Sequence, residues 1–211
     1  LWHAYLSARR REVRALAPGS PGREACTHAV ERALVTMHKM PVLWGMYLDH
    51  VCEGPGVTSA RRAFDRALAS LPLTQHAAHV WPRYLAFVRR EGVPVETAVR
   101  VYRRYLQLEP AAVEDYVALL TQPRVGRWAE AARRLAAALD DDAFRSLQGR
   151  TRHALWLELC DLVTRHPREV EQGDGEAGGA GSGGPAGGSG GGGLDVEAVL
   201  RGGIRRHPEE S

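Results

Sequence analysis

Lysine is almost absent from this sequence of 211 residues, because Lys39 is the only lysine among 28 basic residues and the other 27 are arginines. The formal net charge is only +3. Arginine clusters recur all along the chain, at 9–11, 61–62, 103–104 and 133–134. A dedicated nucleic-acid-binding domain usually concentrates its charge on one face. We therefore expect most arginines to lie on solvated helix faces, with contact between residues 9–11 and RNA phosphates as the minor alternative.

Long hydrophobic runs are missing as well. No stretch approaches the roughly 20 apolar residues of a membrane helix, and no secretory signal pattern is visible, so no membrane partner is expected. The three cysteines, Cys26, Cys52 and Cys160, are far apart and show no CxxC spacing. We expect small buried side chains in a reducing compartment rather than a disulfide framework or a zinc site. Leu1 and Trp2 open directly into helix-like sequence without a preceding methionine, so we expect the chain to be part of a longer protein.

Sequence motifs of enzymes and metal sites are missing too. The chain has no P-loop, and patterns such as G-x-S-x-G and G-x-G-x-x-G are matched only trivially, by the polyglycine tract. His76 and His79 are three residues apart, but no carboxylates or cysteines complete a site at ligand spacing. Residues 140–142 are three aspartates without the spaced pattern of a calcium loop, and they are expected to form a linker after a helix. We expect no enzyme activity, catalytic residue, metal, cofactor or small-molecule substrate.

What the sequence does contain is an internal repeat. Five segments place apolar residues at i, i+3, i+4 and i+7, which is typical of one face of a helix. Aligned on their final leucine or isoleucine, they have anchors at Leu34, Leu68, Leu106, Leu139 and Ile204. The intervals are 34, 38, 33 and 65 residues. The same ladders contain Phe64, Ala67, Tyr102, Leu135 and Leu200.

The long last interval has a visible source. Residues 173–193 contain 13 glycines and almost nothing apolar, so they cannot offset the entropy of ordering and are expected to be a disordered insert. Removing this insert restores the period. We predict four repeats and the first helix of a fifth over 1–172, the insert over 173–193, and the second helix of the fifth repeat over 194–211.

A second ladder precedes each of the first. It carries tryptophan at i, tyrosine at i+3 and leucine at i+4, and its aromatic members are Trp2, Tyr5, Trp44, Tyr47, Trp81 and Tyr84. A looser copy contains Trp156, and the copy with Tyr116 has Val113 in place of tryptophan. Small residues such as Ala33, Ala67 and Ala138 let a partner helix approach these rings, so the tryptophans are expected in the core.

Proline and glycine fall where such a helical hairpin must turn. Gly54-Pro55-Gly56 separates the two helices of one pair, and Pro72 and Pro110 each follow an anchor by four residues. Pro82 requires either a helix start near residue 81 or a kink. The fold class predicted is all-α, an α-solenoid of about five HAT- or TPR-like helix pairs.

The aromatic first helix, the A-x-x-x-[FY]-x-R-[AY]-L second helix and the following proline resemble the half-a-TPR (HAT) repeat. Longer segments resemble the Syf-type family of pre-mRNA-splicing scaffolds, also called the XPA-binding protein 2 family. They are residues 37–44, 61–68, 71–85, 96–106 and 155–162. The insert and the missing tryptophan at Val113 depart from the family pattern.

This resemblance implies a nuclear, non-catalytic protein-interaction scaffold from the N-terminal part of a long HAT arch. Its implied partners are other spliceosomal and Prp19-associated proteins, with weak or indirect RNA contact and a family link to transcription-coupled DNA repair. Three alternatives remain open at this point: direct RNA binding, a helical subunit of an enzyme, and another HAT scaffold of the crooked-neck or 3′-end-cleavage type.

Overall fold

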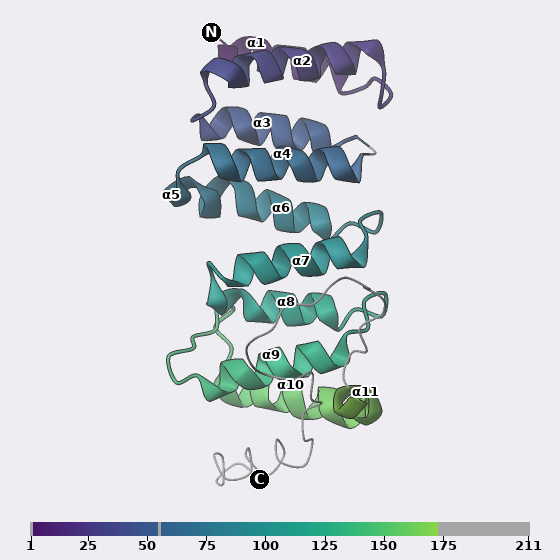
Figure 1. Cartoon of the computed structure of the whole chain (residues 1–211), viewed down its shortest axis with the longest axis vertical. Helices are drawn as coiled ribbons and strands as arrows, with labels where there is room; N and C mark the ends of the chain where they lie inside the picture. The colour runs from purple at the N-terminus through teal and green to yellow at the C-terminus, as the bar shows by residue number, and fades with distance from the viewer. Residues whose placement is uncertain (1, 55, 173–211) are drawn as a thin grey trace, which may run out of the picture. The chain divides into compact units, whose positions relative to one another are not determined.

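The computed structural model describes residues 2–54 and 56–172 of the chain. The chain divides into two compact units, Leu1–Val101 and Tyr102–Ser211. Over residues 2–54 and 56–172 every regular element is a helix, as Figure 1 shows, which confirms the all-α fold class.

The first unit is built from helices joined by short turns. They are α1 (Trp2–Val13), α2 (Pro21–Thr36), α3 (Pro41–Cys52), α4 (Val57–Ser70), the short α5 (Leu73–Gln75), a π-helical turn (His76–Val80), α6 (Trp81–Val88) and the start of α7 (Val95–Leu106). Consecutive helices pack on one another, α1 on α2, α2 on α3 and α3 on α4. This is the helical-hairpin arrangement that the two ladders predict.

Proline and glycine set the helix limits of this unit. Pro21 and Pro41 occupy the first turns of α2 and α3, where a missing amide hydrogen costs nothing. Around Pro82 the structure combines the two alternatives: α6 begins at Trp81 with Pro82 in its first turn, but it continues directly from a π-helical turn and not from a loop. A π-helical turn of this kind is a local irregularity within a helix.

Aromatic rings fill the core of the first unit. Phe64 of α4 is fully buried and stacks on Tyr84 of α6, with ring centroids 4.3 Å apart and planes 4° apart. Trp81 stacks against Tyr84 at 5.9 Å. Ala67, one turn after Phe64, is also fully buried. The predicted packing of large rings against small residues is therefore present where α4 meets its neighbours.

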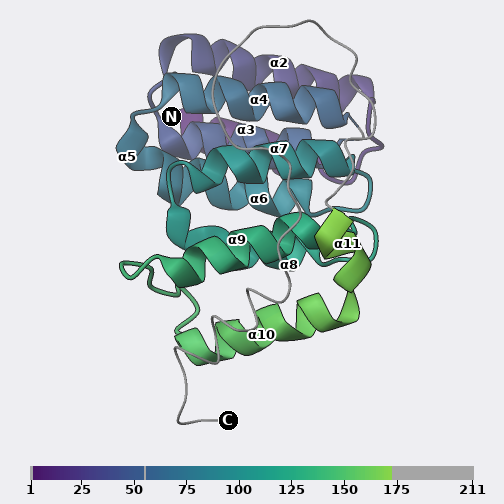
Figure 2. The ribbon, with the colours of Figure 1, turned by 60° about the horizontal axis from the view of Figure 1, so that its bottom comes forward.

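The second unit contains the end of α7, a 3₁₀ turn (Pro110–Ala112), α8 (Val113–Leu120), α9 (Trp128–Asp140), α10 (Arg152–Arg165) and α11 (Pro167–Gln172). α9 packs on both α8 and α10, and the short α11 lies at the end of α10 and contacts α9 (Figure 2). Tyr102 and Tyr116 stack in its core at 5.6 Å. Trp128 stacks on His166 at 3.8 Å, where α9 begins and α10 ends. The linker predicted for residues 140–142 begins one residue later than expected, at Asp141, because Asp140 is the last residue of α9.

The predicted insert at 173–193 and the predicted helix at 194–211, with Leu200 and Ile204, lie outside the described residues. The division of the chain into repeats and an insert therefore stays a prediction.

Candidate protein-docking surfaces

Most of the predicted repeat residues lie in the cores of the two units. The buried ones are Leu34, Trp44, Tyr47, Phe64, Ala67, Leu68, Trp81, Tyr84, Tyr102, Tyr116, Leu135 and Leu139. Leu106 and Trp156 are only half-buried. The prediction of a core position is confirmed for Trp44 and Trp81, and for Trp156 it holds only in part.

Trp2 and Tyr5 differ from their counterparts in α3 and α6. Trp2 is 43% exposed and Tyr5 is 49% exposed, and the two rings make an edge contact with each other at 6.0 Å. The prediction that Trp2 is a core residue is wrong. Trp2 is more exposed than Trp44 because its helix has fewer neighbouring helices. Helix α3 packs against α1, α2 and α4, whereas α1 packs against α2 and α3.

The polar ends of the buried aromatic side chains of α3 are satisfied within the unit. The Trp44 Nε1–H donates to the carbonyl of His38 at 2.7 Å, and the Tyr47 hydroxyl donates to Glu31 Oε1 at 2.7 Å. The guanidinium of Arg66 binds the same Glu31 oxygen at 3.2 Å and lies over the Trp44 and Tyr47 rings at 5.7 and 5.8 Å. Burial and the hydrogen bond to Glu31 raise the pKa of Tyr47 to about 12. These groups support packing.

Asp49 of α3 and Glu53, the residue directly after α3, bind arginines from three other helices. Glu53 accepts hydrogen bonds from Arg10 of α1 and Arg23 of α2, each at 3.1 Å. Asp49 accepts one from Arg83 of α6 at 3.0 Å and lies 3.7 Å from Arg10. Burial alone would raise the pKa of Glu53, but the two arginines outweigh it and hold that pKa below its usual value. We name this set of five residues the α3 ion cluster; it ties α1, α2 and α6 to α3.

Beside the α3 ion cluster lies a small basic hollow. Its volume is about 240 Å³, and its lining is Ser7, Arg10 and Arg11 of α1, Arg14 in the turn directly after α1, and Met46 of α3. All of its charged lining residues are arginines. We refer to it below as the α1–α3 hollow.

In the second unit, one buried carboxylate organises the polar contacts around α9. Glu130 is only 5% exposed, and Arg103 of α7 binds both of its oxygens, at 2.8 and 2.7 Å. The Tyr116 hydroxyl donates to it at 2.5 Å, and Arg127 lies at 3.6 Å. Burial would raise the pKa of Glu130, but the hydrogen bonds from Arg103 and Tyr116 lower it overall. The carboxylate therefore stays charged and joins α7, α8 and α9.

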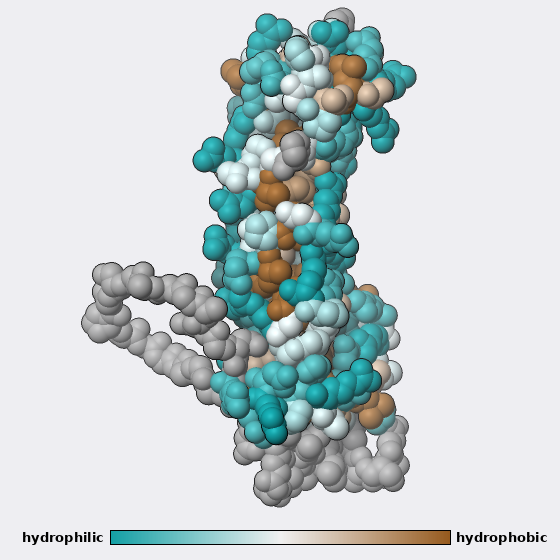
Figure 3. Space-filling view, turned by 90° about the vertical axis from the view of Figure 1, so that its right-hand side faces the viewer, coloured by the Kyte–Doolittle hydropathy of each residue, from teal (hydrophilic) through white to brown (hydrophobic). Residues whose placement is uncertain are grey.

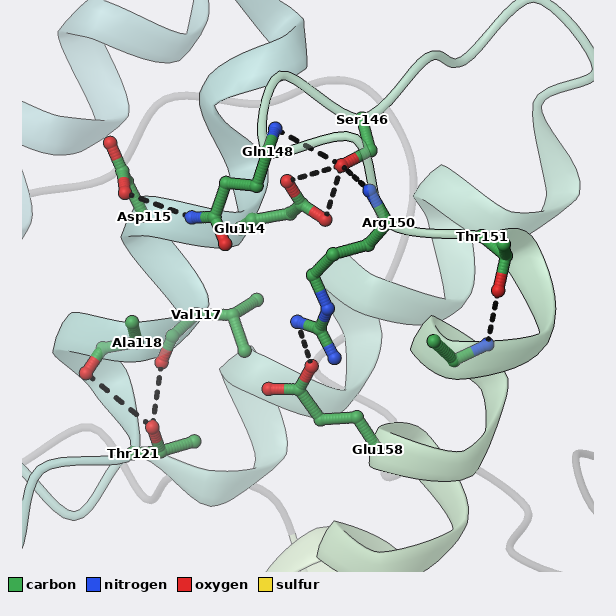
Figure 4. Close-up of polar contacts among 11 residues, drawn as sticks. Glu114, Asp115, Val117, Ala118, Thr121, Ser146, Gln148, Arg150, Thr151 and Glu158 are labelled. Atoms are coloured by element: carbon green, nitrogen blue, oxygen red, sulfur yellow. Dashed lines mark hydrogen bonds and ion pairs between the residues drawn. The ribbon is translucent and has the colours of Figure 1, made fainter.

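A second buried carboxylate holds the loop between α9 and α10. The hydroxyl of Ser146 lies 2.9 and 2.8 Å from the two oxygens of Glu114 (Figure 4). The same hydroxyl oxygen accepts the backbone N–H groups of Gln148 and Arg150, at 3.2 and 2.9 Å. The Gln148 amide also donates to Asp115 at 3.3 Å. One serine thus links the loop to α8 and fixes the conformation of the loop.

The start of α10 is held next to this loop. The Arg150 guanidinium binds Glu158 at 2.6 Å, and the Thr151 hydroxyl caps the helix by accepting the Ala154 N–H at 3.1 Å (Figure 4). Such a cap satisfies an amide that has no partner within the helix.

The candidate cysteines and histidines sit in packing positions. Burial raises the pKa of the Cys26 thiol, and it raises that of Cys52 to about 11, so both are protonated near neutral pH. His50 Nε2 lies 3.1 Å from the Thr27 hydroxyl, and His76 Nε2 lies 2.8 Å from the carbonyl of Leu71. Over residues 2–54 and 56–172, no three His, Cys, Asp or Glu side chains are grouped as metal ligands would be. No helix of that part of the chain is both long and apolar enough to cross a membrane.

The outer surface is mainly hydrophilic. On the face shown in Figure 3, hydrophobic residues form a narrow seam with hydrophilic residues on both sides. Single apolar side chains are exposed elsewhere, among them Val35 at 78% and Leu73 at 75%. Isolated apolar residues of this kind are normal on a protein surface.

The carboxylates were not identified by sequence reasoning. Asp49, Glu53, Glu114 and Glu130 lie on helices that also carry solvated charges, so composition does not separate them from surface residues. The sequence offers one signal: Glu130 directly precedes the apolar ladder of its helix, and Asp49 and Glu53 are four residues apart.

Comparison with known proteins agrees with this geometry. A family model described as the N-terminal HAT repeat of pre-mRNA-splicing factor Syf1/CNRKL1 matches residues 1–111, and one described as the middle HAT repeat of SYF1 matches residues 113–211. The chain is 42% identical to a "Pre-mRNA-splicing factor syf1 homolog" of Drosophila melanogaster over 213 aligned residues, which cover 100% of the chain and 21% of the relative. It is 40% identical to "Pre-mRNA-splicing factor SYF1" of Homo sapiens over 210 residues, 100% of the chain and 22% of the relative.

A more distant relative shows the same coverage. "Pre-mRNA-splicing factor cwf3" of Schizosaccharomyces pombe is 32% identical over 213 residues, 100% of the chain and 24% of the relative. The chain thus spans about a fifth to a quarter of the length of the curated relatives that it matches. Its paired helices, its buried aromatic ladder and these matches place it in one group: the chain belongs to the HAT-repeat family of Syf1 pre-mRNA-splicing factors.

Proposed function

We propose that this chain is part of a non-catalytic scaffold of pre-mRNA splicing, which works in the nucleus by holding other spliceosomal proteins in place. The observation that carries the proposal is the match of relatives named pre-mRNA-splicing factors over the whole chain, at 40–42% identity for two of them. Stacked helix pairs offer extended surfaces to partners and need no catalytic centre, so the fold suits this role.

We infer that the partners include proteins of the Prp19-associated complex and that RNA contact is weak or indirect. The arrangement of the arginines supports the inference. Arg10, Arg23, Arg83 and Arg103 are bound to carboxylates of the chain itself, so their charge is largely used in packing. A surface that binds RNA through its phosphates needs unpaired cations instead.

The repeat division belongs to the same proposal. The pairs α1–α2 and α3–α4 have the order expected of HAT repeats, and the Trp–Tyr ladder and its alanine partners are their structural signature. The glycine-rich segment 173–193 is the insert that interrupts the last repeat.

The alternative of another HAT scaffold is less well supported. The N-terminal family model covers both Syf1 and CNRKL1, but the middle model names SYF1 alone, and the three relatives described above carry syf1, SYF1 and cwf3 names. Those names contain nothing on DNA repair, so the link to transcription-coupled repair is not part of the proposal.

The test is affinity purification of the full-length parent protein from nuclei of its own source, followed by mass spectrometry with and without nuclease. The proposal expects spliceosomal and Prp19-associated proteins that persist after nuclease treatment. Recovery of 3′-end cleavage factors, or loss of every partner on nuclease treatment, would contradict it.

A further inference from the structure

The α1–α3 hollow has an excess of positive charge that the chain does not neutralise. Of its three arginines, only Arg10 is bound by carboxylates, those of the α3 ion cluster. The Arg11 side chain has one weak contact, from its Nε to the carbonyl of Ser7 at 3.4 Å. Within residues 2–54 and 56–172, Arg14 has no carboxylate partner, and neither has Arg11. Two guanidinium groups, one at the end of α1 and one in the turn after it, are therefore free to bind an anion.

Two further donors in the hollow are also poorly used. Among the described residues, the acceptor of the Ser7 hydroxyl is the thioether sulfur of Met46 at 3.8 Å, which is a weak partner for an O–H group. The Arg10 Nε–H is buried and has no acceptor within the described residues. A carboxylate oxygen in the hollow would give the hydroxyl a much stronger acceptor, because hydrogen bonds to ionised groups are shorter and stronger.

The size and lining of the hollow favour a protein side chain as its occupant. A volume of about 240 Å³ lies below the roughly 300–1,000 Å³ of small-molecule sites, so a single side chain fits better than a whole metabolite. No aromatic ring lines the hollow on which a base could stack, whereas proteins that bind single-stranded RNA commonly supply one. Asp49 and Glu53 neutralise the charge of Arg10, so the charge left for a ligand is that of Arg11 and Arg14, which suits one carboxylate better than a continuous phosphate backbone.

We propose that the α1–α3 hollow is a docking point for an acidic segment of a partner protein, with one Asp or Glu carboxylate held by Arg11, Arg14 and the Ser7 hydroxyl and an apolar neighbour packed on Met46. This inference rests on the proposed scaffold function and names the chemistry of one of its partners. Arginine suits the role because its planar fork matches the two oxygens of a carboxylate.

The test measures binding of a short fluorescein-labelled peptide, rich in glutamate and containing one leucine, to the 211-residue chain by fluorescence anisotropy. The variants are the double substitution Arg11→Glu/Arg14→Glu and the single substitution Ser7→Ala. The matched control is Arg32→Glu/Arg62→Glu, which makes the same charge change at two exposed arginines of α2 and α4. Circular dichroism establishes that each variant is folded, and because Ser7→Ala changes no charge it tests the site even if the double variant is unstable.

We expect the glutamate peptide to bind and its glutamine counterpart not to bind, with affinity falling as salt rises. The Arg11→Glu/Arg14→Glu variant should lose about tenfold or more in affinity and Ser7→Ala about threefold, whereas the control should change by less than about twofold. Equal losses in the control and the double variant would overturn the proposal. So would tighter binding of oligouridylate than of the peptide, with the same dependence on Arg11 and Arg14, since the hollow would then serve nucleic acid.

A second measurement separates this inference from the scaffold function. The full-length parent carrying Arg11→Glu/Arg14→Glu is purified from nuclei beside the unsubstituted parent. Loss of one or a few proteins from an otherwise intact spliceosomal set supports both proposals, and an unchanged set overturns the docking point alone. Absence of spliceosomal proteins from the unsubstituted parent overturns the scaffold function, whatever the peptide result.

Discussion

At the scale of single residues, buried carboxylates are the acceptors around which the polar side chains of the second unit are arranged. Glu130 is 5% exposed and accepts hydrogen bonds from Arg103 and Tyr116. A buried charge is costly unless such partners compensate for lost hydration. Removing the charge while keeping the shape should therefore weaken the second unit, because glutamine offers one neutral acceptor oxygen in place of two charged ones and places an NH2 donor beside the guanidinium and the phenol.

We predict that Glu130→Gln lowers the free energy of unfolding by about 2 kcal/mol. This value is at the low end for breaking a buried charge pair. The reason is that the Arg103 side chain is 50% exposed, so water can hydrogen-bond to its guanidinium after the carboxylate is lost. Urea denaturation followed by circular dichroism measures the change. Glu171→Gln, an exposed residue of α11, is the control and should change stability by less than about 0.5 kcal/mol. Equal effects of the two substitutions would show that the contacts of Glu130 contribute nothing.

The same residues predict a loss of stability in acid. The pKa values of Glu53 and Glu130 are lowered in the folded chain, so both groups contribute stability above their unfolded pKa. That contribution is lost as pH falls through the folded pKa, below about pH 4.5. We expect the free energy of unfolding to fall between about pH 6 and pH 3, and to fall less in Glu130→Gln. If Glu130→Gln loses as much free energy of unfolding over this pH range as the unsubstituted chain does, then Glu130 is not held ionised by its partners.

At the scale of elements, the approach of helices depends on small residues facing large rings. Ala67 is completely buried, with 0% of its surface accessible to solvent. It lies one turn from Phe64, whose ring is stacked on that of Tyr84. Added methylenes at such a site force neighbouring side chains or the backbone to move.

We predict that Ala67→Leu destabilises the first unit by about 1–3 kcal/mol, because the longer side chain has no space between α4 and its neighbours. Ala69→Leu is the matched control on the same helix: Ala69 is exposed, so its substitution should leave stability almost unchanged. Urea titrations of both variants make the comparison. A larger loss at residue 69 than at residue 67 would contradict the packing described for α4.

The loop before α10 provides a second prediction at this scale. Ser146→Ala removes the hydroxyl that binds Glu114 and accepts the Gln148 and Arg150 N–H groups. We expect these two amides to exchange with solvent about tenfold faster, measured by hydrogen exchange with NMR detection. Amides in the middle of α10 serve as the internal control and should keep their rates. Unchanged exchange at 148 and 150 would show that the serine does not fix the loop.

The elements were largely predictable from the sequence, for a physical reason. The helical spacing of apolar residues and the Trp–Tyr ladder repeat along the chain, so Phe64, Trp81 and Tyr84 could be assigned to a core before any contact was known. Exposure of Trp2 could not be predicted in the same way, because burial depends on how many helices surround the ladder. The arginine–carboxylate contacts were also hidden, since Arg10 and Glu53 are 43 residues apart and only the fold brings them together.

At the scale of the molecule, each of the two units has its own aromatic core and its own contacts between arginines and carboxylates. In helical-repeat proteins each repeat contacts mainly its neighbours, so stability and binding are distributed along the chain. A protein built in this way can offer several separate docking points, of which the α1–α3 hollow is one. On the proposed function, the role then depends on which proteins are held and not on one reacting group.

The most direct test of the splicing role is a reporter pre-mRNA assay in nuclear extract depleted of the full-length parent protein. The account predicts that splicing stops on depletion and is restored when the purified parent is added back. Splicing that continues at its normal rate in the depleted extract, while 3′-end cleavage fails, would contradict the account and assign this HAT-repeat chain to a different RNA-processing assembly.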